Sequence, residues 1–315
     1  MAVEDAPVLG AADDTEAAPL VVAPSSSGRK SARRKRRQWG LRLSLSWLIL
    51  TVITSVFAAV ISPYGPDVQR LNKTFQGSSW SHWLGTDNYG RDVLSRVIWG
   101  GQAAWEGVAI AMSVAVVLGV PWGVISGYWP RYLGATLMRV ADAMLAFPAL
   151  IFAIVVTGIL GPSLVNSMVV VGVVFSPVIA RLMRVGVLTL RDRSFVESAR
   201  LSGCPTRVIL WRHIFPLAIG PVIVQGTIFT GLAFIIEGAL SFLGFSIQPP
   251  EPSWGGDMAQ AFQYVFSNPL DILPFGIVIA ITVLCIYRVG DSLRDHYGAI
   301  PAFDGSEFEQ ATILA

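Results

Sequence analysis

The residues that could carry chemistry gather in two polar segments of an otherwise apolar chain. The first segment holds His82, Asp87 and Asp92, whose side chains can bind metal ions. Their spacing fits no common set of metal ligands, and helix capping together with surface ion pairs explains the two acids better. The second segment is rich in arginine between Arg191 and Arg212. We recognise no catalytic triad, paired-carboxylate site or metal cluster in either segment, so we expect no enzyme active site.

A phosphate-binding motif of the G-x-x-x-x-G-K-[ST] type is also missing from the sequence. The only lysines are Lys30, Lys35 and Lys73, and none of them follows a glycine-rich turn. The chain is therefore not expected to hydrolyse ATP itself. The two cysteines, Cys204 and Cys285, are too few for a disulfide framework, and we interpret both as structural.

The composition indicates an integral membrane protein. Of the 315 residues, 53% are hydrophobic and 14% are charged, and the mean hydropathy is +0.58. A soluble domain of this length carries about a quarter charged residues. The net charge of +2 says little about partners, because the charges are unevenly placed along the chain. We therefore expect an all-α polytopic membrane protein.

Six apolar segments are candidates for transmembrane helices. They are residues 41–61, 106–128, 140–160, 167–183, 217–238 and 273–287 with their flanks. Pro121 and Pro177 lie inside two of these segments, and we expect the first to kink its helix and the second to break it. A secretory signal peptide is the alternative for the first segment, but its length and the poor cleavage site after it favour a retained helix.

Positive charge on the loops predicts which side of the membrane each loop occupies. Arginine is frequent in the loop after the second span, in the loop after the fourth span and in the C-terminal tail. Residues 161–166 and 248–271 contain neither lysine nor arginine. The loop at 62–105 is an exception, although acids accompany its bases. Because basic loops stay in the cytoplasm, both ends of the chain are predicted to be cytoplasmic.

These features divide the chain into segments. We expect a disordered, basic cytoplasmic tail (1–38), a first transmembrane helix (39–61) and an extracytoplasmic loop with an amphipathic helix (62–105). A transmembrane core (106–298) and a loose cytoplasmic tail (299–315) should follow. Thr86 or Asp87 is expected to cap the amphipathic helix. The basic run at 29–37 could bind nucleic acid, but its position directly before a span favours a topology signal.

The arginine-rich segment, residues 191–216, cannot lie in hydrocarbon. Its pattern predicts a short helix over 192–202, with Phe195, Ala199 and Ser202 on one side. The helix is expected to end before a sharp change of direction, and the whole segment should lie on one side of the membrane.

The sequence also predicts how that change of direction is made. Gly203 is suited to ending the first helix, because a helix often closes on a glycine in a left-handed conformation. Pro205 is suited to the first turn of a second helix over 206–215. Glu197 is spaced to pair with an arginine on either side of it along the first helix.

This segment resembles the EAA loop in the membrane subunits of bacterial ABC importers. The pattern is Glu-Ala-Ala, a glycine six residues after the glutamate, then a histidine and a proline before the next span. The matching residues are Glu197, Ser198, Ala199, Gly203, His213 and Pro216, with Ser198 in place of the usual alanine. The resemblance implies a coupling helix that docks into a groove on an ATPase subunit. An ordinary basic cytoplasmic loop is the alternative.

Two further runs resemble the C-type permease subunits of the oligopeptide, dipeptide and nickel branch of these importers. One is the LGTDNYGRDVLSRVIWG run at 84–100, and the other follows the fifth span at 238–258. The second run implies an outer gate or re-entrant helix, for which a plain interfacial belt is the alternative. The candidate gate residues are Glu237, Phe242, Leu243 and Phe245.

The family resemblance implies a fold and a set of partners. The chain resembles a six-span permease half of a type I ABC importer for di- or oligopeptides in the bacterial cytoplasmic membrane. Its implied partners are a homologous second permease, two cytoplasmic ATPase subunits or a fused one, and an extracytoplasmic substrate-binding protein. ATP and Mg would bind to the ATPase subunits, and no cofactor is expected in this chain.

A secondary transporter or a channel that ATP does not drive is the rival class. Such proteins place ionisable side chains deep in their spans. The candidates here, Asp142 and Glu237, are each expected near one end of a span. Their positions argue against a proton relay and favour the ATP-driven importer.

Overall fold

The computed structural model describes residues 26–298 of the chain. The predictions for residues 1–25 and 299–315 therefore lie outside the described residues. The chain divides into two compact units, Met1–Trp39 and Gly40–Ala315. The second unit contains all the contacts discussed below. Its described part consists of helices, turns and loops, with an isolated β-bridge between Thr86 and Asp92.

Helix α1 spans Ser26–Val56 and is followed by the short α2, Ala58–Ile61. The helix thus starts well before residue 39, and the prediction that residues 26–38 are disordered is wrong. This stretch is rich in arginine and lysine, which are good helix formers, so the helix of the first span extends through it.

The loop after α2 contains a single 3₁₀ turn, η1, at Leu71–Lys73. The helices that follow are α3 (Val93–Tyr128), α4 (Tyr132–Leu145), α5 (Ala149–Leu160), α6 (Leu164–Arg191), α7 (Ser194–Leu201), α8 (Thr206–Val208), α9 (Phe215–Ala218), α10 (Gly220–Phe242), α11 (Trp254–Phe262) and α12 (Leu273–Gly298). A π-helical segment, η2, occupies Ile209–Ile214. Among the described residues, five helices are long and apolar enough to cross a membrane, and α4 with α5 can supply a sixth span.

The third predicted span is not one straight helix. Helices α4 and α5 meet at an angle of 86°. Phe147 precedes Pro148 at the break, and a residue before proline is driven away from helical backbone angles. Pro148 then occupies the position that precedes the first turn of α5. The prediction of one span over 140–160 missed this sharp bend, because both helices are apolar.

The amphipathic helix predicted within residues 62–105 is not a separate element. Those residues enter the first turns of α3, which runs without a break into the second span. Asp92, rather than Thr86 or Asp87, caps this helix, and its carboxylate accepts a hydrogen bond from the Ser95 amide. Gly100 and Gly101 lie inside the helix without interrupting it. Their missing side chains leave room for Trp254 and Ser55 to pack against the helix.

Helix α6 continues through Pro177, so the predicted break there is wrong. Proline has no N–H to offer the carbonyl four residues earlier, which is that of Val173. The Ser176 hydroxyl donates to this carbonyl instead, at 2.7 Å. The substitute hydrogen bond lets the helix pass the proline. Helix α3 likewise contains Pro121.

Helices α3 and α6 pack directly on each other along a stripe of small residues. The stripe on α3 is buried and repeats every four residues, at Gly107, Ala111, Ala115, Gly119, Gly123 and Gly127. A β-carbon at Gly119 would lie 2.7 Å from the Ser176 carbonyl oxygen, and one at Gly123 would lie 2.5 Å from that of Ala180. The two backbones therefore touch, as small residues allow in membrane helix pairs.

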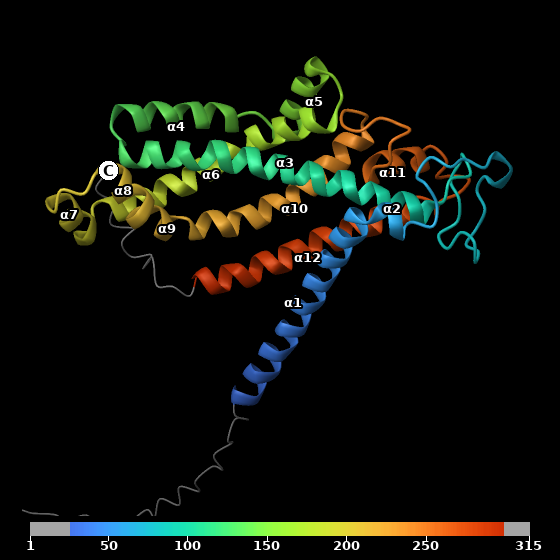
Figure 1. Ribbon diagram of the computed structural model, residues 1–315, viewed down its shortest axis with the longest axis horizontal. Coiled ribbons are helices and arrows are strands. Elements are labelled where there is room, and N and C mark those ends of the chain that lie inside the picture. Colours follow the sequence, from blue (N-terminus) through green and yellow to red (C-terminus); the bar gives the residue numbers. More distant parts are fainter. Residues whose placement is uncertain (1–25, 299–315) are drawn as a thin grey trace, which may run out of the picture. The chain divides into compact units, whose positions relative to one another are not determined.

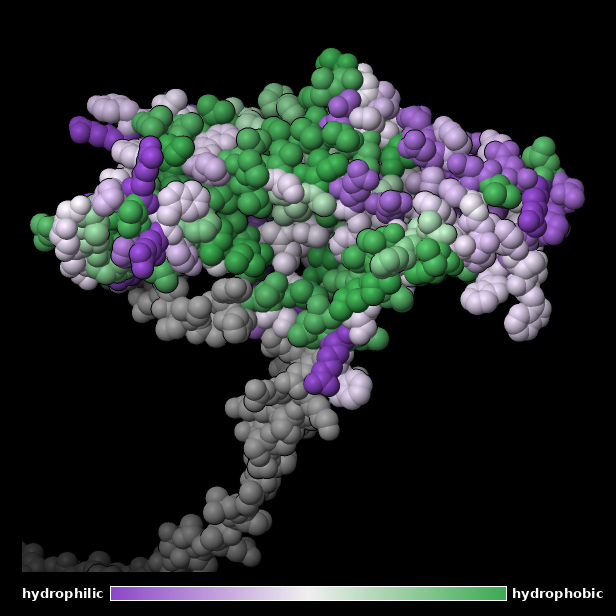
Figure 2. Space-filling model, viewed as in Figure 1, coloured by the Kyte–Doolittle hydropathy of each residue, from purple (hydrophilic) through white to green (hydrophobic). Residues whose placement is uncertain are grey.

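Figure 1 shows that α3, α6, α10 and α12 run alongside one another in the second unit. Helices α7, α8 and α9 lie at one end of this bundle, which we call the corner end. Helix α11 and the loop at 62–92 lie at the other end, which we call the clasp end. Hydrophobic surface covers the middle of the bundle, and hydrophilic surface gathers at both ends (Figure 2). This distribution matches a bundle that crosses a membrane.

Candidate functional site

The corner after α7 is built by backbone hydrogen bonds around Gly203. Its φ angle is +77°, in the left-handed region that favours glycine. The Gly203 amide donates to the Arg200 carbonyl at 3.0 Å, and the Cys204 amide donates to the Ala199 carbonyl at 3.0 Å. Together these bonds form a Schellman motif, the commonest way to end a helix on glycine. The predicted role of Gly203 in ending the first helix is confirmed.

Helix α7 is held by a residue that the sequence pattern did not single out. Val196 is fully buried, and Ala199 packs partly against the core. Phe195, predicted to share a face with Ala199, is 38% exposed. Glu197 and Ser198 are exposed, so this helix leaves both polar side chains of the Glu-Ser-Ala run free on its surface. The prediction of the apolar side was therefore correct for Ala199 and wrong for Phe195.

The ion pairs expected within α7 are not formed. In the part of the chain that the structure describes, Glu197 lies within ion-pair distance of neither Arg193 nor Arg200. Arg200 instead reaches Tyr128 at the end of α3, 3.4 Å from the phenol oxygen and 5.5 Å from the ring centre. Arg191 donates to the Tyr128 backbone carbonyl, also at 3.4 Å. Tyr128 thus connects the end of α3 with the end of α6 and with α7, a role that its sequence position does not reveal.

The segment after the corner leads back to the bundle through an unusual helix. Pro205 precedes the first turn of α8, and the chain then passes through the π-helical η2 into α9. Ile209 and Ile214 are buried and anchor this segment against the core. His213 lies within it, half-buried, with Nδ1 3.5 Å from the Val208 carbonyl oxygen. Single π turns occur often at functional sites.

The second helix was predicted over 206–215, but the helical backbone continues past Pro216. This proline occupies the first turn of α9, where proline is tolerated because its missing N–H is not needed. The corner also exposes large apolar side chains, with Leu201 84% exposed and Trp211 63% exposed. Exposed apolar side chains beside exposed arginines make this a surface suited to another protein.

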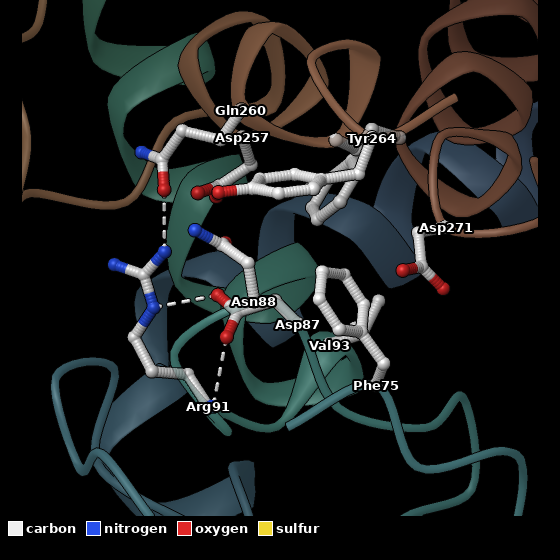
Figure 3. A pocket seen from close by; sticks show the side chains of 11 residues that line it. Phe75, Asp87, Asn88, Arg91, Val93, Asp257, Gln260, Tyr264 and Asp271 are labelled. Atoms are coloured by element: carbon white, nitrogen blue, oxygen red, sulfur yellow. Dashed lines mark hydrogen bonds and ion pairs between the residues drawn. The ribbon is translucent and has the colours of Figure 1, made fainter. Parts of the chain in front are cut away.

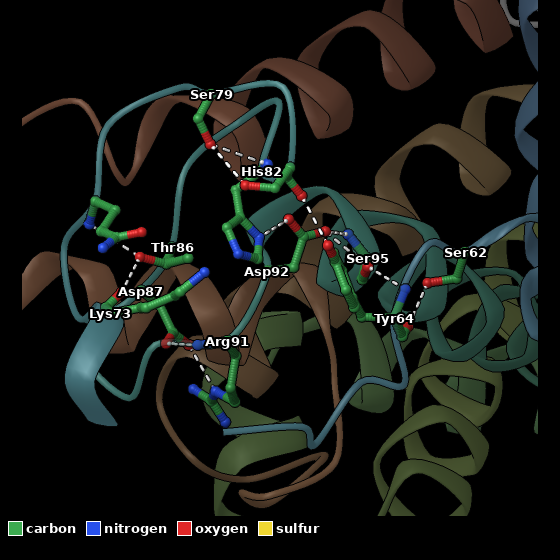
Figure 4. A network of polar contacts seen from close by, with 12 residues as sticks. Ser62, Tyr64, Lys73, Ser79, His82, Thr86, Asp87, Arg91, Asp92 and Ser95 are labelled. Atoms are coloured by element: carbon green, nitrogen blue, oxygen red, sulfur yellow. Dashed lines mark hydrogen bonds and ion pairs between the residues drawn. The ribbon is translucent and has the colours of Figure 1, made fainter. Parts of the chain in front are cut away.

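The clasp end is held by five buried polar residues that we call the clasp: His82, Arg91, Asp92, Arg96 and Asp257. Figure 4 shows His82 pointing at Asp92, with Nδ1 2.9 Å from a carboxylate oxygen. The other carboxylate oxygen of Asp92 accepts from the amide and the hydroxyl of Ser95, at 2.8 and 2.7 Å. Asp92 therefore fixes both the loop at 62–92 and the start of α3. An acid of this run caps the helix, but it is Asp92 and not the expected Thr86 or Asp87, and the expected surface ion pairs are buried.

Arg96 and Asp257 join segments that are far apart in the sequence. The Arg96 guanidinium donates to Asp257 at 2.6 Å and to the backbone carbonyls of Pro66 and Pro250 at 3.0 and 3.3 Å. Burial raises the pKa of Asp257 to about 6, although the neighbouring Arg96 charge lowers it. Removing either partner would leave a buried charge without compensation, which is strongly destabilising.

Arg91 makes the second connection to α11. Its guanidinium donates to Asp87 and to Gln260, both at 2.6 Å. Figure 3 shows the Arg91 guanidinium between these two side chains, with Asp257 close to Gln260. The Trp254 indole adds a bond to the Val97 carbonyl at 2.8 Å. The clasp therefore ties α11 to the start of α3 at several points.

The residues expected to form an outer gate differ in their surroundings. Glu237 is buried, and its carboxylate accepts from the Ser241 hydroxyl at 2.8 Å. Helix α10 continues past Gly238 to Phe242, so Glu237 does not cap a break there. Phe242 faces the Phe262 ring at 5.9 Å, Leu243 is 50% exposed, and Phe245 packs against the core. A gate at these four positions stays a prediction.

The whole chain can be compared with known proteins. A model for the family described as "Binding-protein-dependent transport system inner membrane component" matches residues 119–299. A peptide transport system permease protein of Brucella suis is 36% identical over 84% of this chain and 89% of its own. The dipeptide permease of Alkalihalophilus pseudofirmus is 34% identical over 78% of this chain and 80% of its own. A glutathione transport system permease of Escherichia coli is 35% identical over 84% and 87%.

A solved structure shares the fold. The methionine ABC transporter, in an inward-facing conformation, matches with a TM-score of 0.51 and 17% identity. The match covers 64% of this chain and 96% of that chain. This likeness supports the fold of a type I importer permease.

Proposed function

Because this chain belongs to the family of binding-protein-dependent transport system inner membrane components, we propose that it forms half of a path for di- or oligopeptides through the membrane. The chain is a multi-pass permease subunit of the inner membrane, of the ABC importer class. Peptide cargo is favoured by relatives named for peptide, dipeptide and glutathione transport.

The exposed corner at Gly203 is the observation that carries the proposal. A Schellman motif fixes its backbone, and Val196 and Ile214 anchor its two sides in the core. Glu197 and Ser198 face outward beside it. A rigid corner with exposed polar and apolar side chains can transmit movement from a partner to α6 and α10, which adjoin its two sides.

Three kinds of protein partner complete the proposed machine. A second, homologous permease supplies the other half of the path, and an extracytoplasmic binding protein delivers the peptide. Two ATPase subunits, or a fused one, bind ATP with Mg and dock against the corner. The corner end and both chain termini would then face the cytoplasm, and the clasp end would face outward. This orientation follows the excess of arginine at 191–212.

The proposed mechanism is alternating access. Closure of the ATPase pair on ATP moves both corners, and each corner carries its α6–α10 pair with it. Buried Ile209, Ile214 and Ala218 make the segment after the corner part of the core, so it cannot move independently of the bundle. Hydrolysis and release of the ATPase pair reverse the movement.

Reconstitution tests this function. The complex of both permeases and the ATPase is placed in proteoliposomes and supplied with the binding protein and labelled dialanine. We expect accumulation of the dipeptide that requires ATP and the binding protein. Uptake driven by a proton or sodium gradient without ATP would assign the chain to secondary transport. A complex that accumulates no peptide while hydrolysing ATP would contradict the peptide assignment.

A further inference from the structure

A cavity of about 620 Å³ opens at the clasp end, and neither the corner nor the clasp uses it. One wall is a face of α3, a second is the chain at 246–252, and the third is the chain at 162–164 just before α6. Its volume lies in the range of small-molecule sites, which is about 300 to 1,000 Å³. The cavity can therefore hold a small peptide.

The α3 wall presents one helical face of chemically useful side chains. Trp99, Gln102 and Glu106 line the cavity at spacings of three and four residues, which places them above one another on the helix. Gln102 and Glu106 are exposed. Glu106 lies where the 22 apolar and small residues of 107–128 begin, so its carboxylate sits at the edge of the span.

The cavity carries negative charge without a compensating base in its lining. Glu106 and Glu251 line it, and the lining contains no lysine, arginine or histidine. Arg96 lies close to the rim, where it donates to the carbonyls of Pro66 and Pro250. Its charge is already paired with the buried Asp257 at 2.6 Å. The cavity is thus suited to a positively charged group.

A second feature of the lining is the aromatic ring of Trp99. The indole nitrogen of Trp99 is buried, and it has no hydrogen-bond partner among the described residues. Because this nitrogen has almost no accessible surface, it does not open onto the cavity, and the Trp99 ring is the part of the side chain that can face a bound molecule. The ring face of a tryptophan also attracts cations.

We propose that this cavity is a transit site for the amino end of the transported peptide. The proposal rests on the proposed function and names a contact on its path. The peptide ammonium group binds Glu106 and Glu251, and the Trp99 ring lies beside it. Gln102 lies one turn from Glu106 and donates to a neighbouring peptide oxygen. The clasp has a positioning role, because Arg96 holds the carbonyls of Pro66 and Pro250 at the rim.

The test uses the complete permease and ATPase complex in lipid nanodiscs, without the binding protein. Binding of L-alanyl-L-alanine and of its N-acetyl form is followed by saturation-transfer NMR. We expect the free-amino peptide to bind and the acetylated peptide to bind at least roughly tenfold more weakly, because a charge-assisted hydrogen bond is lost. Glu106→Gln should weaken binding of the free-amino peptide by a similar factor. Glu106→Asp should restore most of it.

Matched controls separate the site from general damage. Asp142 is an exposed carboxylate paired with Arg181 and lies outside the cavity lining, so Asp142→Asn should leave binding unchanged. Trp99→Phe keeps an aromatic ring and removes an N–H that does not open onto the cavity, so it should leave the preference for the free-amino peptide unchanged. Equal binding by the wild type and Glu106→Gln would overturn the proposal. Loss of the second permease from the Glu106→Gln complex would also overturn it, because the carboxylate would then serve the subunit interface.

The uptake assay distinguishes a failure of the transit site from a failure of the proposed importer function. If the wild-type complex accumulates dialanine with ATP, and Glu106→Gln and Glu251→Gln accumulate it equally well, the transit site is wrong and the importer stands. If the wild-type complex neither binds nor accumulates any peptide, the peptide assignment fails, and the transit site fails with it.

Discussion

Buried charged side chains hold the clasp end together, and the ionisation of Asp257 matters most for its stability. It is 4% exposed and faces Arg96 directly, with Arg91 and Asp87 also close enough to act on it. Burial removes water from its carboxylate and outweighs the attraction of both arginines, so its pKa rises from the ordinary 3.8 of an aspartate to about 6.

This shift predicts a pH dependence of stability. Because the pKa of Asp257 is raised in the folded protein, the folded state holds the proton over a pH range in which the unfolded chain has lost it. Stability from this group therefore falls as the pH rises from about 4 to about 6, and stays constant above that. Two pKa units correspond to roughly 3 kcal/mol.

Thermal unfolding of the purified complex at pH 4.5 and pH 7 checks this prediction. Asp257→Asn cannot ionise, so the wild type should gain stability relative to this variant at the lower pH. The matched change Asp67→Asn removes a carboxylate that is 53% exposed, and it should leave the pH dependence as in the wild type. The same pH dependence in wild type and Asp257→Asn would show that another group is responsible.

At the scale of the elements, the contact between α3 and α6 depends on the small residues of the α3 stripe. At Gly123 a β-carbon would lie 2.5 Å from both the Ala180 carbonyl oxygen and the Met183 β-carbon. No side chain fits there unless the helices move apart. Close backbone approach is what gives such pairs their packing energy in a membrane.

Gly123→Ala should therefore destabilise the protein. Overpacking of a close contact costs about 1–3 kcal/mol, which should lower the unfolding temperature of the detergent-solubilised subunit by several degrees. Gly158→Ala in α5 is the matched control, because its β-carbon would lie 3.5 Å from Phe245 in ordinary contact. An unfolding temperature for Gly123→Ala equal to that of Gly158→Ala would contradict the close packing.

The elements also show what local sequence can and cannot predict. Apolar length located the regions of the spans, and Gly203 marked a true helix end. Proline was less informative, because its effect depends on what replaces the lost hydrogen bond. Ser176 supplies that bond beside Pro177, whereas Phe147 and Pro148 lie at the sharp bend between α4 and α5. A proline therefore indicates a place where a helix can break, and neighbouring side chains decide the outcome.

At the scale of the whole molecule, the pairs that join distant segments were beyond sequence reasoning. Arg96 and Asp257 are 161 positions apart, and no local period connects them. Tyr128 meets Arg200 across 72 positions in the same way. The runs at 84–100 and 238–258 contain Arg96 and Asp257, but the spacing of the acids in the first run suggested surface ion pairs. Burial depends on the three-dimensional packing of α11 against α3, which one sequence does not show.

The proposed orientation predicts which residues a membrane-impermeant thiol reagent can reach in intact cells. The background protein carries Cys204→Ala and Cys285→Ser, so that only an introduced cysteine reacts. Gln248 and Ser198 are both exposed and lie at opposite ends of the bundle. We expect Gln248→Cys to be labelled from outside and Ser198→Cys to be labelled only after permeabilisation. The reverse labelling pattern would show that the topology is opposite to the one proposed.

The central claim is that the Gly203 corner couples this permease to an ATPase, and one substitution tests it most directly. Gly203→Val places a β-branched residue at φ +77°, which costs about 1–2 kcal/mol of backbone strain. A β-carbon there would touch nothing within 4 Å, so the spans should still insert normally. Gly203→Asn is the matched control, because asparagine tolerates the left-handed region better.

The measurement is ATP hydrolysis by the purified complex, stimulated by the loaded binding protein, at equal membrane levels of each variant. We predict that Gly203→Val lowers this hydrolysis, or the ATPase retained with the complex, roughly five- to thirtyfold, the factor that one to two kcal/mol allows. Gly203→Asn should remain close to the wild type. Normal hydrolysis and normal ATPase retention in well-inserted Gly203→Val would contradict the claim and reduce the segment to an ordinary basic loop.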